Sequence, residues 1–275
     1  GARICGRTAL TFVGAGAGGC IMYPSDIRPL TSLRIIAALW VLVYHFRGHL
    51  GLDIDRVGIV AKGYLGVDLF FILSGFILGH VYLPKWESKS FHYGSFLWAR
   101  LSRIYPVHLV TLVATIAIWL VATRIGATFN PIAFDPAAIP QHLLLIHAWG
   151  TTPGMQWNFP SWSISAEWFA YLCFPLVALT VLGLQRWRWA PIAVAGVLFG
   201  LMFWTVESYG LPLGEVTRLG FIRIVPEFLM GAALYQFGRR TSLPRALPLV
   251  LAAGSLVWIA VAATYRLSDA VIWPG

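Results

Sequence analysis

The chain has 275 residues, of which 58% are hydrophobic and only 11% are charged, with a formal net charge of +9. Soluble domains carry about 25% charged residues, because their surfaces face water. This composition excludes a soluble globular enzyme, a disordered chain and a collagen-like repeat, and it indicates an integral membrane protein. The positive charge is dispersed along the chain, which argues against a nucleic-acid-binding arm.

The first 25 residues differ from the rest of the chain. Arg3 and Arg7 precede a short apolar run, as in a signal peptide, and residues 14–19 match the G-x-G-x-x-G pattern. The strand–helix–strand unit and the later acidic residue that a dinucleotide site needs do not follow. We therefore expect residues 1–25 to be a non-homologous extension, disordered or wrongly included, and residues 26–275 to form a membrane domain.

Seven stretches of the chain approach the roughly 20 apolar residues that a membrane-spanning helix needs. The fold that we predict is all-α, a polytopic transmembrane helix bundle. Its seven expected spans are residues 32–46, 65–83, 104–123, 161–184, 190–206, 221–238 and 246–264. A shorter apolar run, residues 141–149, lies in the connector between the third and fourth spans, and we expect it to be interfacial or re-entrant.

Lys and Arg are about twice as frequent in the segments that a cytoplasmic N-terminus would place inside the cell, so the positive-inside rule favours that orientation. The three cysteines, Cys5, Cys20 and Cys173, show no disulfide framework and no metal-ligand spacing, and we expect no bound metal. The chain begins without Met and stops just after an apolar stretch, so we expect it to be a fragment of a longer protein.

Ionisable residues inside spans cost at least ~2.5–3.5 kcal/mol at the membrane centre and are therefore candidates for function. Arg34 and His45 lie eleven residues apart on the first span, which places them on one helix face about 16 Å apart. A snorkelling arginine and an interfacial histidine are the plainer interpretation of this pair. Asp68 opens the second span, where a carboxylate also complements the helix dipole.

The third and fourth spans add further candidates. Arg100 and Arg103 share a helix face before the third span, where their guanidinium groups suit phosphate, although they also fit simple positive-inside anchoring. Ser163 and Glu167 share a face of the fourth span, and Glu167 needs a partner there, if only a structural hydrogen bond. Glu227 is a weaker case in the sixth span, and we expect His108 in the third span to be packed and hydrogen-bonded.

Together these residues form two predicted layers. The inner, cationic layer suits a polyanionic donor and comprises Arg34, Arg100 and Arg103. The outer layer suits proton abstraction from an acceptor and comprises His45, Asp68 and Glu167.

In this pattern the chain resembles the acyltransferase-3 family of bacterial membrane O-acyltransferases over about residues 26–238. The resemblance rests on five motifs in the right order: Arg34-x10-His45, GVDLFFILSGFIL, Arg100-x-x-Arg103, PSWSISAEWFAYLCFPL and PEFLMGAALY. The family usually has about ten spans, whereas seven are counted here, and no hydrolase-like domain follows. Both departures fit a truncated chain.

The resemblance implies an enzyme that moves an acyl group, usually acetyl from acetyl-CoA, to a hydroxyl of a cell-envelope glycan, a lipid or an antibiotic. It implies acyl-CoA as a donor substrate reached from the cytoplasm, a glycan or lipid-linked acceptor, no resident cofactor, and a place in the bacterial cytoplasmic membrane. The expected catalytic residues are His45, Asp68 and Glu167, the expected donor-binding residues are Arg34, Arg100 and Arg103, and the expected acceptor-lining residues are Ser161, Trp162 and Ser163.

In the expected reaction His45 is the general base and Asp68 or Glu167 orients its imidazole. A covalent acyl-histidine is an equally open route. A secondary transporter with the same charges as a relay is the alternative function, although the sequence shows neither the inverted repeats nor the paired broken helices that such proteins often have. A structural scaffold would leave the aligned Arg34–His45 pair unexplained.

Overall fold

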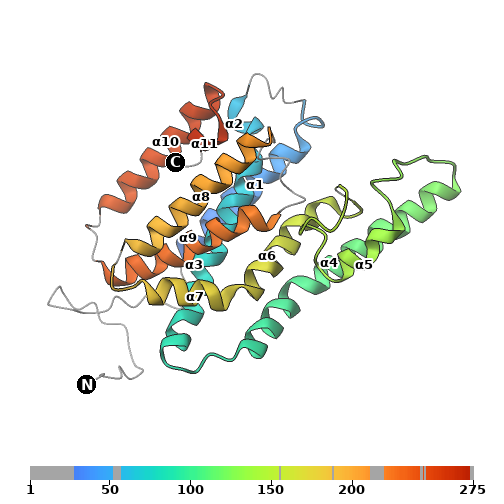
Figure 1. The fold of residues 1–275 in the computed structure, drawn as a ribbon. Coiled ribbons are helices and arrows are strands. Elements are labelled where there is room, and N and C mark those ends of the chain that lie inside the picture. The colour runs from blue at the N-terminus through green and yellow to red at the C-terminus, as the bar shows by residue number, and fades with distance from the viewer. Residues whose placement is uncertain are drawn as a thin grey trace.

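The structure is a computed structural model that describes residues 28–51, 57–154, 156–187, 189–210, 220–241, 244 and 246–272, and these residues form helices and turns without a β-strand. The predicted extension, residues 1–25, lies outside the described residues, as does the G-x-G-x-x-G segment. The helices (Figure 1) are α1 (Arg28–Phe46), α2 (Gly58–Ala61), α3 (Gly66–Glu87), α4 (Tyr93–Arg124), α5 (Ile139–Leu143), α6 (Trp162–Leu172), α7 (Phe174–Gly183), α8 (Ala190–Ser208), α9 (Gly220–Arg240), α10 (Ala246–Thr264) and α11 (Asp269–Ile272).

The predicted helical membrane bundle is confirmed, and each of the seven predicted stretches falls on a helix or, in one case, on a pair of helices. By length and composition, three helices of the described chain are able to cross a membrane: residues 63–87, α4 and α8. The bent pair α6–α7 makes a fourth if it is one span, while α1 and α10 are shorter apolar helices. The total of seven spans therefore stays a prediction.

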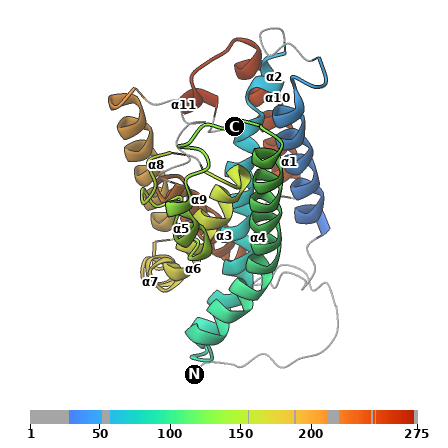
Figure 2. The same cartoon turned by 90° about the vertical axis from the view of Figure 1, so that its right-hand side faces the viewer.

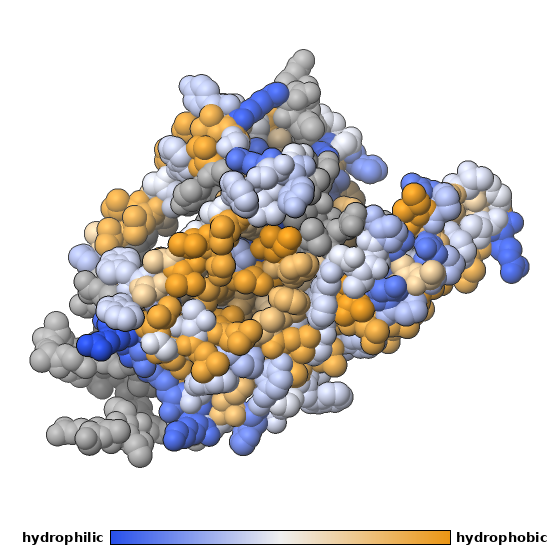
Figure 3. Space-filling model, in the orientation of Figure 1, coloured by the Kyte–Doolittle hydropathy of each residue, from blue (hydrophilic) through white to orange (hydrophobic). Residues whose placement is uncertain are grey.

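Hydrophobic side chains cover much of the outer surface, as a lipid-facing protein requires. Figure 3 shows them over a broad central area of one face, with hydrophilic residues toward its edges. On α4, for example, Val110, Ile118 and Val121 are all exposed. Such a surface fits the lipid environment of a bilayer.

The centre of the bundle is the contact between α3 and α9, and α9 also packs against α6, α7 and α8. Two glycines let the α3 and α9 backbones approach closely. A Cβ at Gly75 would overlap the carbonyl oxygen of Phe228, and one at Gly231 would overlap that of Ile72. Small residues at a helix contact are typical of membrane bundles. This explains the glycines at the ends of the motif segments FILSG, which contains Gly75, and PEFLMG, which contains Gly231.

Helix α1 runs antiparallel to α3. The C-terminal end of α1 packs against the turn that precedes α3. A Cβ at Gly63 would contact Tyr44 at 2.5 Å, and one at Gly66 would lie 2.9 Å from the carbonyl oxygen of Ala37. The His45 end of α1 therefore lies beside the start of α3. Arg34, about 16 Å back along α1, lies beside a point well inside α3.

The fourth predicted span, residues 161–184, is broken. Its two halves, α6 and α7, meet at Cys173 with a bend of 55°. Pro175, in the first turn of α7, has no N–H, and its ring collides with the carbonyl four residues earlier in a continuous helix. The sequence interpretation treated this apolar stretch as one helix, and Pro175 favours the break that makes it two.

Helix α4 is longer than its predicted span of residues 104–123. Its 32 residues correspond to about 48 Å, which exceeds the roughly 30 Å of a hydrocarbon core, and in Figure 2 it runs along most of the height of the molecule. Arg100 and Arg103 consequently lie inside the helix rather than before it. The backbone of α4 therefore fixes the positions of both residues along the helix.

Candidate functional site

The fold brings the three predicted donor-binding arginines together at one level of the bundle. Arg34 on α1 interacts electrostatically with Arg103, Glu167 and Tyr171. Tyr171, on α6, interacts in turn with Glu167, Arg100 and Arg103. We call Arg34, Arg100 and Arg103, together with Glu167, the arginine cluster.

Positive charge is in excess in the arginine cluster, because it contains three guanidinium groups and a single carboxylate. That carboxylate also accepts a hydrogen bond of 2.8 Å from Ser74 on α3. Arg100 lies over the ring of Tyr82, 5.7 Å from its centroid, and its buried Nε has no hydrogen-bond partner among the described residues. The arginine side chains remain partly accessible, and the cluster suits an anionic ligand that brings several negative charges.

The position of Glu167 differs from the sequence interpretation, which grouped it with His45 and Asp68. Its partner Ser74 lies six residues beyond Asp68 on α3, or about 9 Å further along the helix. Glu167 is therefore grouped with Arg34 and not with His45. The sequence interpretation counted the depth of each residue from the start of its own span, which assumes that all spans begin at the same level. In the structure, it is the C-terminal end of α1 that lies beside the start of α3.

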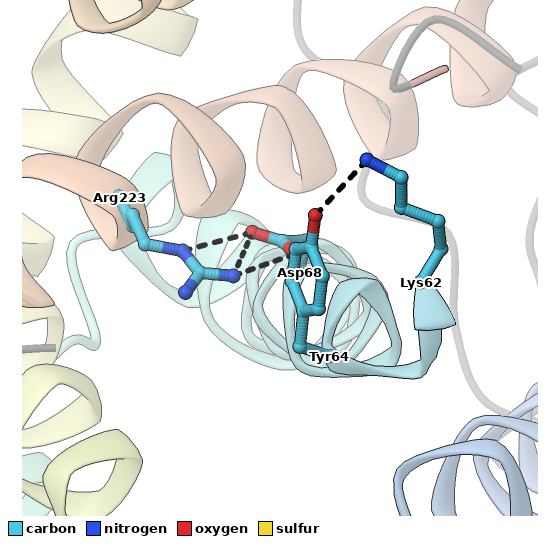
Figure 4. Close-up of polar contacts among 4 residues, drawn as sticks. All are labelled: Lys62, Tyr64, Asp68 and Arg223. Carbon is cyan, nitrogen blue, oxygen red and sulfur yellow. Dashed lines mark hydrogen bonds and ion pairs between the residues drawn. The ribbon is translucent and has the colours of Figure 1, made fainter. Parts of the chain in front are cut away.

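Asp68 forms a buried, bidentate ion pair with Arg223, which comes from α9 (Figure 4). The Arg223 Nη2 atom donates to both carboxylate oxygens at 2.7 Å and Nε donates to Oδ1 at 3.1 Å. The two side chains are only 3% and 1% exposed. Trp162 covers the guanidinium group, with its ring centroid 5.1 Å away.

Arg223 is not among the candidate residues that the sequence analysis identified. A signal existed, because a buried carboxylate such as Asp68 needs a cationic partner. Glu227, one helical turn after Arg223, is fully buried, and its carboxylate oxygens have no hydrogen-bond partner among the described residues. It interacts electrostatically with Asp68 and Arg223. We call Asp68, Arg223 and Glu227 the buried acidic site.

His45 lies at the exposed end of α1. Its Nδ1 is 2.8 Å from the carbonyl oxygen of Val41, and because a carbonyl can only accept, Nδ1 carries the hydrogen. In the neutral ring Nε2 is then the nitrogen with the free lone pair. No hydrogen bond joins His45 to Asp68 or Glu167 within the described part of the chain, so it is the backbone that fixes this imidazole.

The three residues predicted to line an acceptor pocket open α6. Ser161 is buried, its hydroxyl donates to the carbonyl of Asn158 at 2.6 Å, and it lies 3.1 Å from His147 Nε2. Ser163 donates to the carbonyl of Pro160 at 3.2 Å. Trp162 lies against Arg223, as described above. The contact of these residues with an acceptor stays a prediction.

Three further histidines gather near Ser161, and sequence reasoning singled out only one of them. His108 on α4 is buried, and its Nε2 lies 2.9 Å from the carbonyl oxygen of His142, so it is packed and hydrogen-bonded as predicted. Within the residues that the structure describes, no group of His, Cys, Asp or Glu side chains is arranged to hold a metal ion.

The chain is similar in sequence to known proteins. A family model described as "Acyltransferase domain" matches residues 29–270, which is most of the chain. The chain belongs to this acyltransferase family. The resemblance that the sequence motifs indicated is thereby confirmed.

Individual relatives of the family agree with that assignment. "Acyltransferase MdmB" of Streptomyces mycarofaciens is 31% identical over 71% of this chain and 53% of its own length. "Protein 2 in picA locus" of Rhizobium radiobacter is 36% identical over 38% of this chain and 51% of its own length. "Putative O-acetyltransferase SACOL0978" of Staphylococcus aureus is 26% identical over 68% of this chain and 29% of its own length. The chain thus spans about half the length of the first two relatives, and no solved structure matches it.

Proposed function

We propose that this protein is a membrane O-acyltransferase that moves an acyl group, which we expect to be acetyl, from acyl-CoA to a hydroxyl of a cell-envelope glycan or lipid. The proposal extends the family assignment to a donor, an acceptor class and a set of residues. We further propose that the arginine cluster faces the cytoplasm, where acyl-CoA is made, and that the protein lies in the bacterial cytoplasmic membrane.

The observation that carries the proposal is the excess of guanidinium groups in the arginine cluster. Three arginines and one carboxylate give the cluster a formal excess of two positive charges, and the buried Nε of Arg100 has no hydrogen-bond partner among the described residues. Guanidinium groups bind phosphate oxygens strongly and often in pairs. The phosphates of CoA supply the charge that the cluster lacks.

The reaction follows from the His45 tautomer. His45 Nε2 accepts the proton of the acceptor hydroxyl while its oxygen attacks the thioester carbonyl. The new C–O bond forms, the C–S bond breaks, and the CoA thiolate takes up the proton from the imidazolium. The Val41 carbonyl stabilises the imidazolium in the place that an acid takes in a triad. An acyl-histidine formed at the same nitrogen gives the same products.

The secondary transporter has one supporting feature, the bend between α6 and α7, because broken helices are common in transporters. The family assignment and the names of the relatives favour acyl transfer instead. We therefore retain the enzyme as the proposal.

Transfer of label from radiolabelled acetyl-CoA, measured in membranes that contain the protein, tests the role of His45. Replacing a general base costs about 10²- to 10⁴-fold, so we expect His45→Ala to lose nearly all transfer. His49→Ala is the matched control, because His49 is an exposed histidine one helical turn further on, and it should retain transfer. Wild-type rates in His45→Ala, at equal protein levels, would contradict the proposal.

A further inference from the structure

In the connector between α4 and α6, residues 125–158 lie outside the candidate spans and contain polar side chains that the proposed reaction does not use. Two imidazole rings of this connector stack with a third from α4. The rings of His142 and His147 lie 3.9 Å apart, centroid to centroid and nearly parallel, and His108 lies 5.8 Å from His147 in the same orientation. All three are buried.

The polar groups of this stack are not all satisfied. Neither ring nitrogen of His142 has a hydrogen-bond partner among the described residues, although only 1% of the residue is exposed. Gln156 donates from Nε2 to the carbonyl of Ile132 at 2.8 Å, while its Oε1 is buried without a partner. Buried polar atoms without partners are rare and costly, and here they point to a ligand group.

These side chains line a small cavity that also contacts Asn158 and Trp162. The cavity has room for about one water molecule, so it fits a single hydroxyl or hydroxymethyl group. Its lining contains no Lys, Arg, Asp or Glu. Burial lowers the pKa of His142 to about 4 and that of His147 to about 3, and neighbouring imidazoles act in the same direction. The lining is therefore neutral at physiological pH.

Gln156 also lines a second, larger groove, which has a volume of about 600 Å³. That volume is typical of a small-molecule site. Trp119, Phe134 and Pro131 supply apolar surface to the groove, and Asn130 and Asp135 supply polar groups. Aromatic faces beside amide and carboxylate groups suit the body of a sugar ring, which has both C–H faces and hydroxyls.

We infer that the connector is the acceptor-binding site, in which the groove takes a neutral sugar unit of the acceptor and the histidine-lined cavity takes one of its non-reacting hydroxyls. This inference rests on the proposed function, because it names the acceptor class of that reaction. His142 and Gln156 offer a hydrogen-bond donor and acceptors to the hydroxyl. A site built in this way discriminates against an analogue that lacks the group. The absence of cations from the cavity argues for a neutral ligand.

A competition between two alcohols tests the inference. The purified full chain in detergent receives acetyl-CoA with equal concentrations of myo-inositol and cyclohexanol, two six-membered rings that differ in hydroxyl number. Mass spectrometry gives the ratio of inositol ester to cyclohexyl ester, and thiol titration gives CoA release. Because both esters form in one sample, their ratio does not depend on the amount of folded protein.

We expect Gln156→Leu to lower this ester ratio about 2- to 10-fold, the range for one neutral hydrogen bond. His142→Phe, which keeps a stacked ring but removes both nitrogens, should lower it in the same direction. Gln236→Leu is the matched control, because Gln236 is equally buried on α9 and lies outside both cavities; it should keep the wild-type ratio.

The possible failures are distinguishable. A wild-type ratio in both cavity variants overturns the inference, and so does CoA release by the wild type without either ester. A lack of acetyl-CoA-dependent CoA release in the wild type refutes the proposed function itself, and the inference with it.

Discussion

Two charged regions of the molecule lie about 9 Å apart along α3 and differ in their balance of charge. The buried acidic site sets two carboxylates, Asp68 and Glu227, against the single guanidinium of Arg223, and all three are almost inaccessible. The arginine cluster sets three guanidinium groups against one carboxylate and is partly open. The first site is closed and holds one complete ion pair, Asp68–Arg223, whereas the second is partly open and has an excess of positive charge.

We interpret the first group of charges as stabilising the bundle and propose that the second group binds a ligand. Asp68 and Arg223 connect α3 to α9, whose close contact depends on Gly75 and Gly231. An ion pair in that position satisfies its own members and has little capacity left for a substrate. The arginine cluster has more guanidinium groups than carboxylates, and we propose that an anionic ligand completes it. Sequence reasoning, which considers each charge singly, gave Asp68 and Glu167 the same kind of role.

The largest effect that we expect comes from breaking the Asp68–Arg223 pair. Removing one member of a buried ion pair costs about 3–5 kcal/mol, because the other charge stays buried without its hydrogen-bonded partner. Asp68→Leu and Arg223→Leu should each destabilise the protein by that amount in an SDS or thermal unfolding titration. The double variant Asp68→Leu/Arg223→Leu should recover part of the loss, since apolar replacement of a whole pair is often neutral, whereas Glu227 stays buried without Arg223.

The same double variant decides what Asp68 does. If it folds and transfers acetyl groups, Asp68 acts through the structure, as the comparison of the two regions implies. If it folds with near-normal stability and has lost transfer, Asp68 takes part in the reaction and the comparison is wrong.

An intermediate effect is expected from the arginine cluster. A hydrogen bond to a charged group contributes about 1.5–3 kcal/mol, so Arg103→Ala should raise the KM for acetyl-CoA roughly 10- to 150-fold. The unfolding midpoint should change little, because Arg103 is exposed. Arg124→Ala is the control at the other end of α4. An unchanged KM in Arg103→Ala would remove the phosphate-binding role from the cluster.

The sequence predicted the helices well because the signal for a span is local. Twenty apolar residues in a row are constrained by the bilayer alone, so each predicted stretch became helical. The break at Cys173 had a local signal too, Pro175, which the continuous apolar composition outweighed. The partners of the charged residues are different, because they depend on how far each helix is displaced along its neighbour.

The pair of Asp68 and Arg223 shows that limit most clearly. Its members are separated by 155 positions, and nothing in the spacing of either motif relates them. The same holds for Glu167, whose depth depends on where α1 and α3 begin to overlap. The imidazole stack could not be predicted either, because His142 and His147 lie in a connector whose sequence has no regular hydrophobic periodicity.

The smallest effect that we expect is a pH dependence that comes from this stack. The pKa of His142 lies near 4 and that of His147 near 3 because the folded protein buries them, whereas an unfolded histidine titrates near 6.5. As the pH falls below about 6.5, the unfolded chain binds protons that the folded chain excludes, and stability falls until the folded imidazoles titrate.

Between pH 7 and 5.5 each of these two histidines should lower the stability by no more than about 1.4 kcal/mol. His142→Phe removes one titrating group, and the unfolding midpoint in detergent should then depend less steeply on pH than in the wild type. His49→Ala, which removes an exposed histidine, should keep the wild-type slope. An equal slope in His142→Phe and the wild type would mean that the connector does not hold its histidines neutral, and the neutral cavity would lose its physical basis.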